Sequence, residues 1–182
     1  MQDIFHKHVI EPIGTSEIFH TKFFTSPFAN ILYDLFKEHK EWTSKRFAYS
    51  THDVHLSESF PDIFSIIKDR FESLILRTMA DIWYLDNSTK VKDIFIVKYS
   101  KDTQIKLNTH IDDSYISGSI KLNNNYKGGV LKFPRQSVTN QEAEVGDLLL
   151  WPSQITHPHN SSPLEEGEKY SITIWTDAKN NS

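Results

Sequence analysis

The sequence predicts an α+β fold in which N-terminal helices support a double-stranded β-helix, or jelly-roll, core. Two observations lead to this prediction. Up to about residue 90 the apolar side chains recur at helical spacing, whereas beyond Asp86-Asn87-Ser88 they alternate with polar ones in short runs. Turns rich in Gly and Asn separate those later runs, which is typical of a barrel or sandwich of short strands.

Two helices are expected in the first half of the chain. Ser26 and Pro27 have the composition of a helix start, with Ser as the cap and Pro in the first turn, and the apolar spacing after them predicts a helix over about 27–40. A second start at Ser59 precedes a long apolar stripe that ends near Tyr84.

Strands are expected between and after these helices. Residues 19–24 are expected to form an edge strand. His52-Asp53-Val54-His55 is expected to form a polar strand on the surface or beside the barrel mouth. The alternative is that His52 and His55 contact the substrate or support the metal ligands. The strands expected for the core are 94–99, 105–109, 115–122, 130–133, 148–151 and 170–175.

Length and composition predict one domain over residues 1–182, with a helical part at about 1–90 and a catalytic jelly-roll at about 91–177. An apolar share of 38% and an aromatic share of 13% are enough for a core, and the absence of cysteine excludes disulfides and thiolate metal sites. A net charge of −4 without a basic cluster predicts neither nucleic acid nor membrane as a partner. Since no apolar leader is visible, we expect a soluble, cytoplasmic protein.

The chemistry-bearing residues lie in the second half. His110 and Asp112 are two positions apart, so on a strand both side chains would point to one face. Two imidazoles and one carboxylate on one face of Fe(II) leave the other face open for a chelating cosubstrate and dioxygen. A third ligand must then come from a distant strand, and His157 and His159 are both candidates that geometry alone does not separate.

Lys169 is expected near the start of the last strand with its ammonium directed into the barrel. An ammonium group in that place can pair with the far carboxylate of a dicarboxylic cosubstrate through a charge-assisted hydrogen bond. The order His-x-Asp, Gly-Gly, Gly-Asp, late His and basic residue makes an iron site far more specific than a lone His-x-Asp.

These residues resemble the iron(II)- and 2-oxoglutarate-dependent oxygenases, above all the catalytic domain of procollagen-lysine hydroxylases and more broadly the prolyl 4-hydroxylases. The resemblance covers about residues 49–177. It rests on Tyr49-Ser50-Thr51-His52-Asp53-Val54-His55-Leu56, Val97-Lys98-Tyr99, Ile155-Thr156-His157-Pro158-His159 and Gly167-Glu168-Lys169-Tyr170. The lysyl enzymes have Arg where this chain has Lys169, whereas prolyl 4-hydroxylases have Lys, which weakens the substrate assignment.

The resemblance implies His110, Asp112 and His159 as iron ligands. It selects His159 because the basic residue follows ten positions later in that family, as Lys169 does here. Counting from Pro152 would select His157 instead, as in some prolyl hydroxylases. The resemblance also implies that Lys169 and Tyr99 bind 2-oxoglutarate, the alternative for Tyr99 being an ordinary interior tyrosine.

The resemblance further implies the cofactor Fe(II), the cosubstrates 2-oxoglutarate and O2, and ascorbate as a further candidate. The expected function is hydroxylation of an unactivated C–H, on a lysyl or prolyl side chain of a protein or peptide. Two alternatives stay open, namely hydroxylation of a free amino acid or small metabolite, and a non-catalytic jelly-roll that binds metal or ligand. The oligomeric state is left open, with a homodimer as one candidate.

Overall fold

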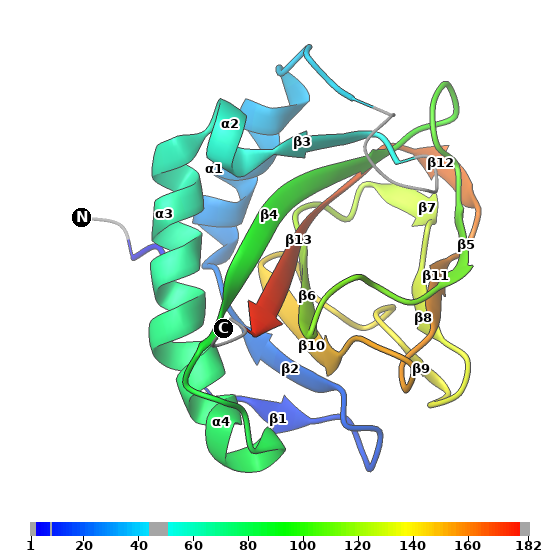
Figure 1. The fold of residues 1–182 in the computed structure, drawn as a ribbon. Coiled ribbons are helices and arrows are strands. Elements are labelled where there is room, and N and C mark those ends of the chain that lie inside the picture. The colour runs from blue at the N-terminus through cyan, green and yellow to red at the C-terminus, as the bar shows by residue number, and fades with distance from the viewer. Residues whose placement is uncertain (1–2, 8, 44–50, 179–182) are drawn as a thin grey trace.

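The computed structural model describes residues 3–7, 9–43 and 51–178. A large antiparallel sheet crosses the molecule, helices cover one of its faces, and smaller strands face the other (Figure 1). The expected α+β class with a jelly-roll core is thereby confirmed. Tyr49 and Ser50, where the family resemblance begins, lie outside the described residues.

The helical layer contains both predicted helices. The first, α1 (Ser26–Lys37), has Pro27 in its first turn, but Thr25 rather than Ser26 takes the cap position. The second is one long stretch made of α3 (Pro61–Arg70), the π-helical turn η1 (Phe71–Leu76) and α4 (Arg77–Trp83). A single helical turn, α2 (Leu56–Ser59), precedes it and is separated from it by Phe60, whose backbone is not helical. Within the described ranges, no helix is long and apolar enough to span a bilayer.

The large sheet has the strand order β1-β2-β10-β6-β13-β4-β3. Its strands are β1 (Glu11–Pro12), β2 (Phe19–Lys22), β3 (Asp53–His55), β4 (Thr89–Tyr99), β6 (Ile116–Lys121), β10 (Asp147–Pro152) and β13 (Lys169–Ala178). Residues before position 90 therefore supply three strands as well as the helices, and β2 lies between β1 and β10 rather than at the edge.

The opposing strands form a small sheet of order β5-β11-β8-β9 and a separate β12-β7 pair. Their bounds are β5 (Leu107–His110), β7 (Tyr126–Gly128), β8 (Leu131–Phe133), β9 (Val138–Thr139), β11 (His159–Ser161) and β12 (Leu164–Gly167). This second layer brings β5 and β11, which are distant in sequence, side by side (Figure 1).

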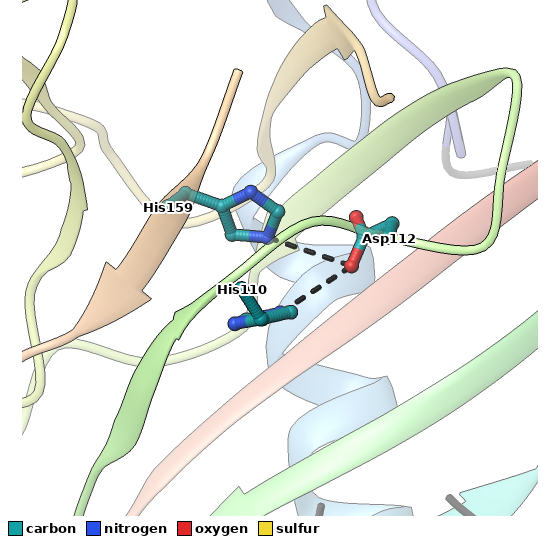
Figure 2. Close-up of side chains that lie close together, drawn as sticks. All are labelled: His110, Asp112 and His159. Carbon is teal, nitrogen blue, oxygen red and sulfur yellow. Dashed lines mark ion pairs between the residues drawn. The ribbon is translucent and has the colours of Figure 1, made fainter. Parts of the chain in front are cut away.

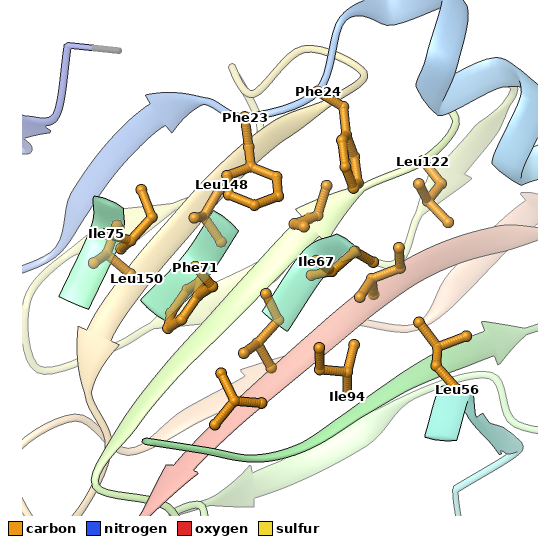
Figure 3. Close-up of a cluster of buried hydrophobic side chains, with 14 of the residues drawn as sticks. Phe23, Phe24, Leu56, Ile67, Phe71, Ile75, Ile94, Leu122, Leu148 and Leu150 are labelled. Carbon is orange, nitrogen blue, oxygen red and sulfur yellow. The ribbon is translucent and has the colours of Figure 1, made fainter. Parts of the chain in front are cut away.

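The main core lies between the large sheet and the helices (Figure 3). Side chains alternate along each strand, so that Ile172 and Ile174 of β13 face the helices and are fully buried, while their neighbours face the small sheet. Burying each such side chain contributes about 1.5–3 kcal/mol to stability. The apolar face fixes the sheet on the helices, which leaves the opposite face available for a site.

Candidate metal centre and cosubstrate pocket

Three side chains predicted from the sequence converge between the two sheets. His110 ends β5, His159 begins β11, and the two residues are direct partners in the antiparallel register. The Asp112 Oδ1 atom lies 3.4 Å from His110 Nε2 and 3.5 Å from His159 Nε2 (Figure 2). The expectation that His110 and Asp112 share one strand is wrong, because β5 stops at His110 and Asp112 lies in the loop that crosses to β6.

Hydrogen bonds hold the remaining polar atoms of these side chains in place. The Nδ1 atom of His110 lies 2.8 Å from the carbonyl oxygen of Asn108, and that of His159 lies 3.0 Å from the carbonyl oxygen of His157. Since a carbonyl only accepts, each Nδ1 donates to its carbonyl, and each Nε2 is the ring nitrogen that faces the centre and would supply a lone pair to a bound cation. Ser117 Oγ donates to Asp112 Oδ2 at 2.6 Å, which leaves Oδ1 as the inward ligand atom.

The converging atoms fit a divalent metal ion. The three ligand atoms all lie within 4.8 Å of one another. Adjacent ligands on an octahedral ion with bonds of about 2.1 Å would lie about 3 Å apart, which is close to the 3.4 and 3.5 Å that separate Asp112 Oδ1 from the two Nε2 atoms. Two neutral imidazoles and one carboxylate form the donor set that suits non-haem Fe(II).

The Asp112 carboxyl is buried yet ionised. Burial by itself would raise its pKa, but hydrogen bonds with His110, His159 and Ser117 hold that pKa well below its usual range. The side chain therefore presents a full negative charge to the centre at neutral pH, as a ligand for a cation requires.

His157 lies outside this cluster. Its Nε2 atom is 2.9 Å from the carbonyl oxygen of Ser16, and its Nδ1 atom is 2.9 Å from Thr156 Oγ1. Both ring nitrogens are thus engaged elsewhere, and of the two late histidines the structure brings only His159 to the cluster. Asp113 is exposed and pairs with Lys92 at 2.9 Å.

A pocket extends from the cluster along the inner face of the large sheet. Lys169, Ser171, Thr173 and Trp175 of β13 all line it, as period-2 alternation requires. Tyr99 of β4 lies opposite Lys169 in the strand register and lines the same end of the pocket. The two residues predicted to bind the cosubstrate are therefore neighbours, and they line the same pocket as His110, Asp112 and His159.

Lys169 is a buried cation. Its Nζ atom donates to the Gly129 carbonyl oxygen at 2.6 Å and to Ser161 Oγ at 3.5 Å, and lies 4.7 Å from the centre of the Tyr99 ring. Burial, together with the charge of Lys121, lowers the pKa of Lys169 to about 7. Among the described residues no carboxylate lies within 4 Å of this ammonium. A buried cation without a counter-ion is unfavourable, so this end of the pocket suits an anion.

Tyr99 has its phenol buried beside this lysine. Burial raises the pKa of Tyr99, and a hydrogen bond with Ser161 offsets only part of that effect. The hydroxyl therefore keeps its proton at neutral pH and is available as a hydrogen-bond donor to an anion.

The strand with His52 and His55 differs from the expectation. Asp53 and His55 are buried rather than exposed, and Thr51 lines the pocket. Thr51, which lines the pocket, and Ser117, which contacts Asp112, were not predicted from the sequence as site residues. A signal for Ser117 was available, because β6 alternates Ser117 and Ser119 with apolar Ile116 and Ile120, which indicates a polar inner face.

Fold and site together define a jelly-roll with a candidate two-histidine, one-carboxylate centre. Residues 94–177, a little less than half of the chain, match the sequence profile of the 2OG-Fe(II) oxygenase superfamily. That range contains His110, Asp112, His159, Tyr99 and Lys169.

Similar sequences are found among the procollagen-lysine dioxygenases. Human procollagen-lysine,2-oxoglutarate 5-dioxygenase 2 is 33% identical over 86 residues, which cover 46% of this chain and 12% of the relative. The multifunctional procollagen lysine hydroxylase and glycosyltransferase of Caenorhabditis elegans is 27% identical over 66% of this chain and 17% of its own length. The chain thus spans only a small part of these relatives.

Solved structures share the fold at low sequence identity. A prolyl-4-hydroxylase from Pseudomonas putida superposes with a TM-score of 0.71 at 17% identity, covering 92% of this chain and 96% of that one. The viral collagen prolyl hydroxylase of Paramecium Bursaria Chlorella virus-1, solved with 2OG, gives 0.66 at 12% identity, covering 90% and 97%.

Proposed function

We propose that this chain is an Fe(II)- and 2-oxoglutarate-dependent dioxygenase that hydroxylates an unactivated C–H on a lysyl or prolyl side chain of a protein or peptide. The observation that carries the proposal is the pairing of two features in one pocket: the cluster of His110, Asp112 and His159, and the buried ammonium of Lys169. A metal-binding cluster alone would suit many reactions. A buried cation beside it specifies an anionic cosubstrate.

Each residue has a distinct task in this proposal. His110, Asp112 and His159 bind Fe(II) on one face, and the hydrogen bonds from their other polar atoms keep the ligand atoms aimed inward. Lys169 and Tyr99 bind the far carboxylate of 2-oxoglutarate, the first by charge and the second by donating a hydrogen bond. When bound, Fe(II) with 2-oxoglutarate and O2 supplies the oxidising chemistry.

The apolar wall keeps the ligands rigid and dry. The indole ring of Trp151 packs edge-on against His159, with ring centres 5.0 Å apart, and Phe133 packs on the same imidazole at 5.4 Å. His159 is 5% exposed and Asp112 is 6% exposed. Because water is largely excluded, electrostatic interactions with the metal and the cosubstrate are stronger there than at an exposed site.

The substrate class is inferred from the relatives. Procollagen-lysine dioxygenases are among the proteins similar to this chain in sequence. One structure of the same fold is a Trichoplax adhaerens prolyl hydroxylase in complex with a hypoxia inducible factor peptide fragment, at a TM-score of 0.65 and 16% identity. These names support a protein or peptide substrate for this chain and leave its identity to experiment.

The proposal is tested by assaying succinate formation with Fe(II), 2-oxoglutarate and ascorbate, in the presence of lysyl and prolyl peptides. The wild type should form succinate, and Asp112→Ala should form none. The matched control is Asp113→Ala, which removes the adjacent but exposed carboxylate and should behave as wild type. Mass spectrometry then reports whether one oxygen is added to peptide or to free amino acid. Absence of succinate from the wild type, or normal turnover by Asp112→Ala, would contradict the proposal.

A further inference from the structure

Ser161 lies between the two residues that are proposed to bind the cosubstrate carboxylate. Its side chain is buried, with 5% of the residue exposed, and it lines the pocket. The Ser161 Oγ atom is 3.5 Å from Lys169 Nζ, and the Ser161 hydroxyl is also hydrogen-bonded with the hydroxyl of Tyr99. One buried hydroxyl therefore contacts both the ammonium and the phenol at this end of the pocket.

The position of Ser161 is fixed by the strand that carries it. Ser161 ends β11, the strand that the metal-cluster residue His159 begins. This strand is paired on both sides, so that Ser161 lies opposite Leu107 of β5 and Leu131 of β8. With the backbone held in this way, only rotation about χ1 and of the hydroxyl proton remains to the side chain. The small sheet thus places one hydroxyl at a defined point beside Lys169 and Tyr99.

The donors and acceptors of these three groups can be counted. An ammonium has three protons and accepts nothing, whereas a serine hydroxyl has one proton and two lone pairs. Lys169 donates one proton to the Gly129 carbonyl oxygen at 2.6 Å and directs another at Ser161 Oγ. Because Lys169 cannot accept, the proton of Ser161 goes to the oxygen of Tyr99. One proton of Lys169 and the single proton of Tyr99 are then left for a ligand.

We propose that Ser161 is a positioning residue that directs the protons of Tyr99 and Lys169 at the far carboxylate of 2-oxoglutarate. This inference rests on the proposed function. By donating to the Tyr99 oxygen, Ser161 turns the phenol proton away from itself, and by accepting from Lys169 it holds the ammonium beside that phenol. A hydroxyl that accepts a hydrogen bond also donates a stronger one, so the two contacts support each other.

The first test compares two substitutions at this position. Ser161→Ala removes the hydroxyl, whereas Ser161→Thr retains one on the same carbon. The Kd of 2-oxoglutarate is measured by calorimetry on Mn(II)-loaded protein, which reports binding without turnover. Ser161→Ala should weaken 2-oxoglutarate binding about three- to tenfold, the usual effect of one hydrogen bond, and Ser161→Thr should restore most of the affinity. The Kd of Mn(II) alone should be the same in the wild type and in both variants.

A second ligand separates positioning from a general change in the pocket. 2-Oxopentanoate keeps the keto acid that chelates a metal but lacks the far carboxylate, so Ser161→Ala should bind it as the wild type does. A merely structural role would weaken the binding of both compounds. Ser162→Ala is the matched control, because the hydroxyl of this neighbouring serine accepts from the backbone N–H of Val130 at 2.9 Å and lines a different groove. It should leave the Kd of 2-oxoglutarate unchanged.

The outcomes that overturn the inference differ from those that overturn the proposed function. Wild-type affinity for 2-oxoglutarate in Ser161→Ala, or equal losses of affinity for 2-oxoglutarate and 2-oxopentanoate, would remove the positioning role and leave the enzyme assignment intact. If the Mn(II)-loaded wild type failed to bind 2-oxoglutarate, the proposed function itself would be wrong, and this inference with it.

Discussion

His110 and His159 lie directly opposite each other on the antiparallel strands β5 and β11, with their ring centres 4.4 Å apart. Direct cross-strand partners have their Cβ atoms only about 4.5–5.5 Å apart, so two side chains from distant parts of the chain can share one ion. Asp112 reaches the same point from the loop after β5. The cluster therefore depends on the pairing of two short strands.

His159→Ala should reduce metal affinity far more than His157→Ala. The first substitution removes one of three converging ligand atoms, whereas the second removes a ring that is hydrogen-bonded to Ser16 and Thr156. His157→Ala should instead lower the free energy of unfolding by about 1 kcal/mol, because the partly buried carbonyl of Ser16 loses its hydrogen-bond donor. Titration with Mn(II) and chemical denaturation measure the two effects. The reverse ranking in metal affinity would make His157 the third ligand.

Ser117→Ala should weaken metal binding without removing a ligand. The Ser117 hydroxyl donates to the outer oxygen of Asp112 and so fixes the carboxylate with Oδ1 inward. Loss of such a supporting hydrogen bond typically costs about 10- to 100-fold in metal affinity. Ser119→Ala is the matched control, because Ser119 lies on the same face of β6 and makes no hydrogen bond with Asp112. Equal affinities in the two variants would contradict this role for Ser117.

Binding of 2-oxoglutarate should weaken as the pH rises above about 7. Burial lowers the pKa of Lys169 to about 7, so below that pH the free protein already carries the ammonium charge that the anion requires. Above it, binding must take up a proton, and affinity should fall by about tenfold per pH unit until the higher pKa of the complex is reached. Calorimetry between pH 6 and 8.5 measures this slope.

Lys169→Arg provides the control for that pH dependence. A guanidinium stays charged throughout this range, so the variant should show a flat profile even if its affinity is lower. The same slope in both proteins would assign the titration to another group.

The His20–Asp147 contact should make stability depend on pH. His20 Nε2 lies 2.9 Å from Asp147 Oδ2, and the hydrogen bond that His20 donates to this carboxylate raises the pKa of His20 against the opposing effect of burial. A raised His pKa contributes stability that is fully present below the unfolded value of about 6.5 and is lost as pH rises through the folded value. Relative to His20→Gln, the wild type should gain about 0.5–1 kcal/mol at pH 6 and lose this advantage by pH 9. Urea unfolding of both proteins at both pH values measures this difference in the free energy of unfolding. A difference that increases from pH 6 to pH 9 would contradict the prediction.

Much of the fold was readable in the sequence. Helical spacing predicted α1 and the long stretch that ends at Trp83, and the short apolar runs after residue 90 predicted β4, β6, β10 and β13 of the large sheet. Strand ends were less accurate, because they depend on which neighbour a segment meets. The early end of β5 is an example, since the chain leaves the small sheet after His110 and Asp112 lies in the loop that crosses to β6.

By itself, the sequence determined the residue types of the candidate centre, the basic residue on the last strand and the alternation that sends Lys169, Ser171 and Thr173 to one face. Only the tertiary structure decided that His159 rather than His157 joins the cluster, that Lys169 is buried without a carboxylate partner among the described residues, and that Asp53 lies inside the sheet edge. The reason is physical. Periodicity along a strand is local and follows from the backbone, whereas burial and convergence depend on which distant strands become neighbours.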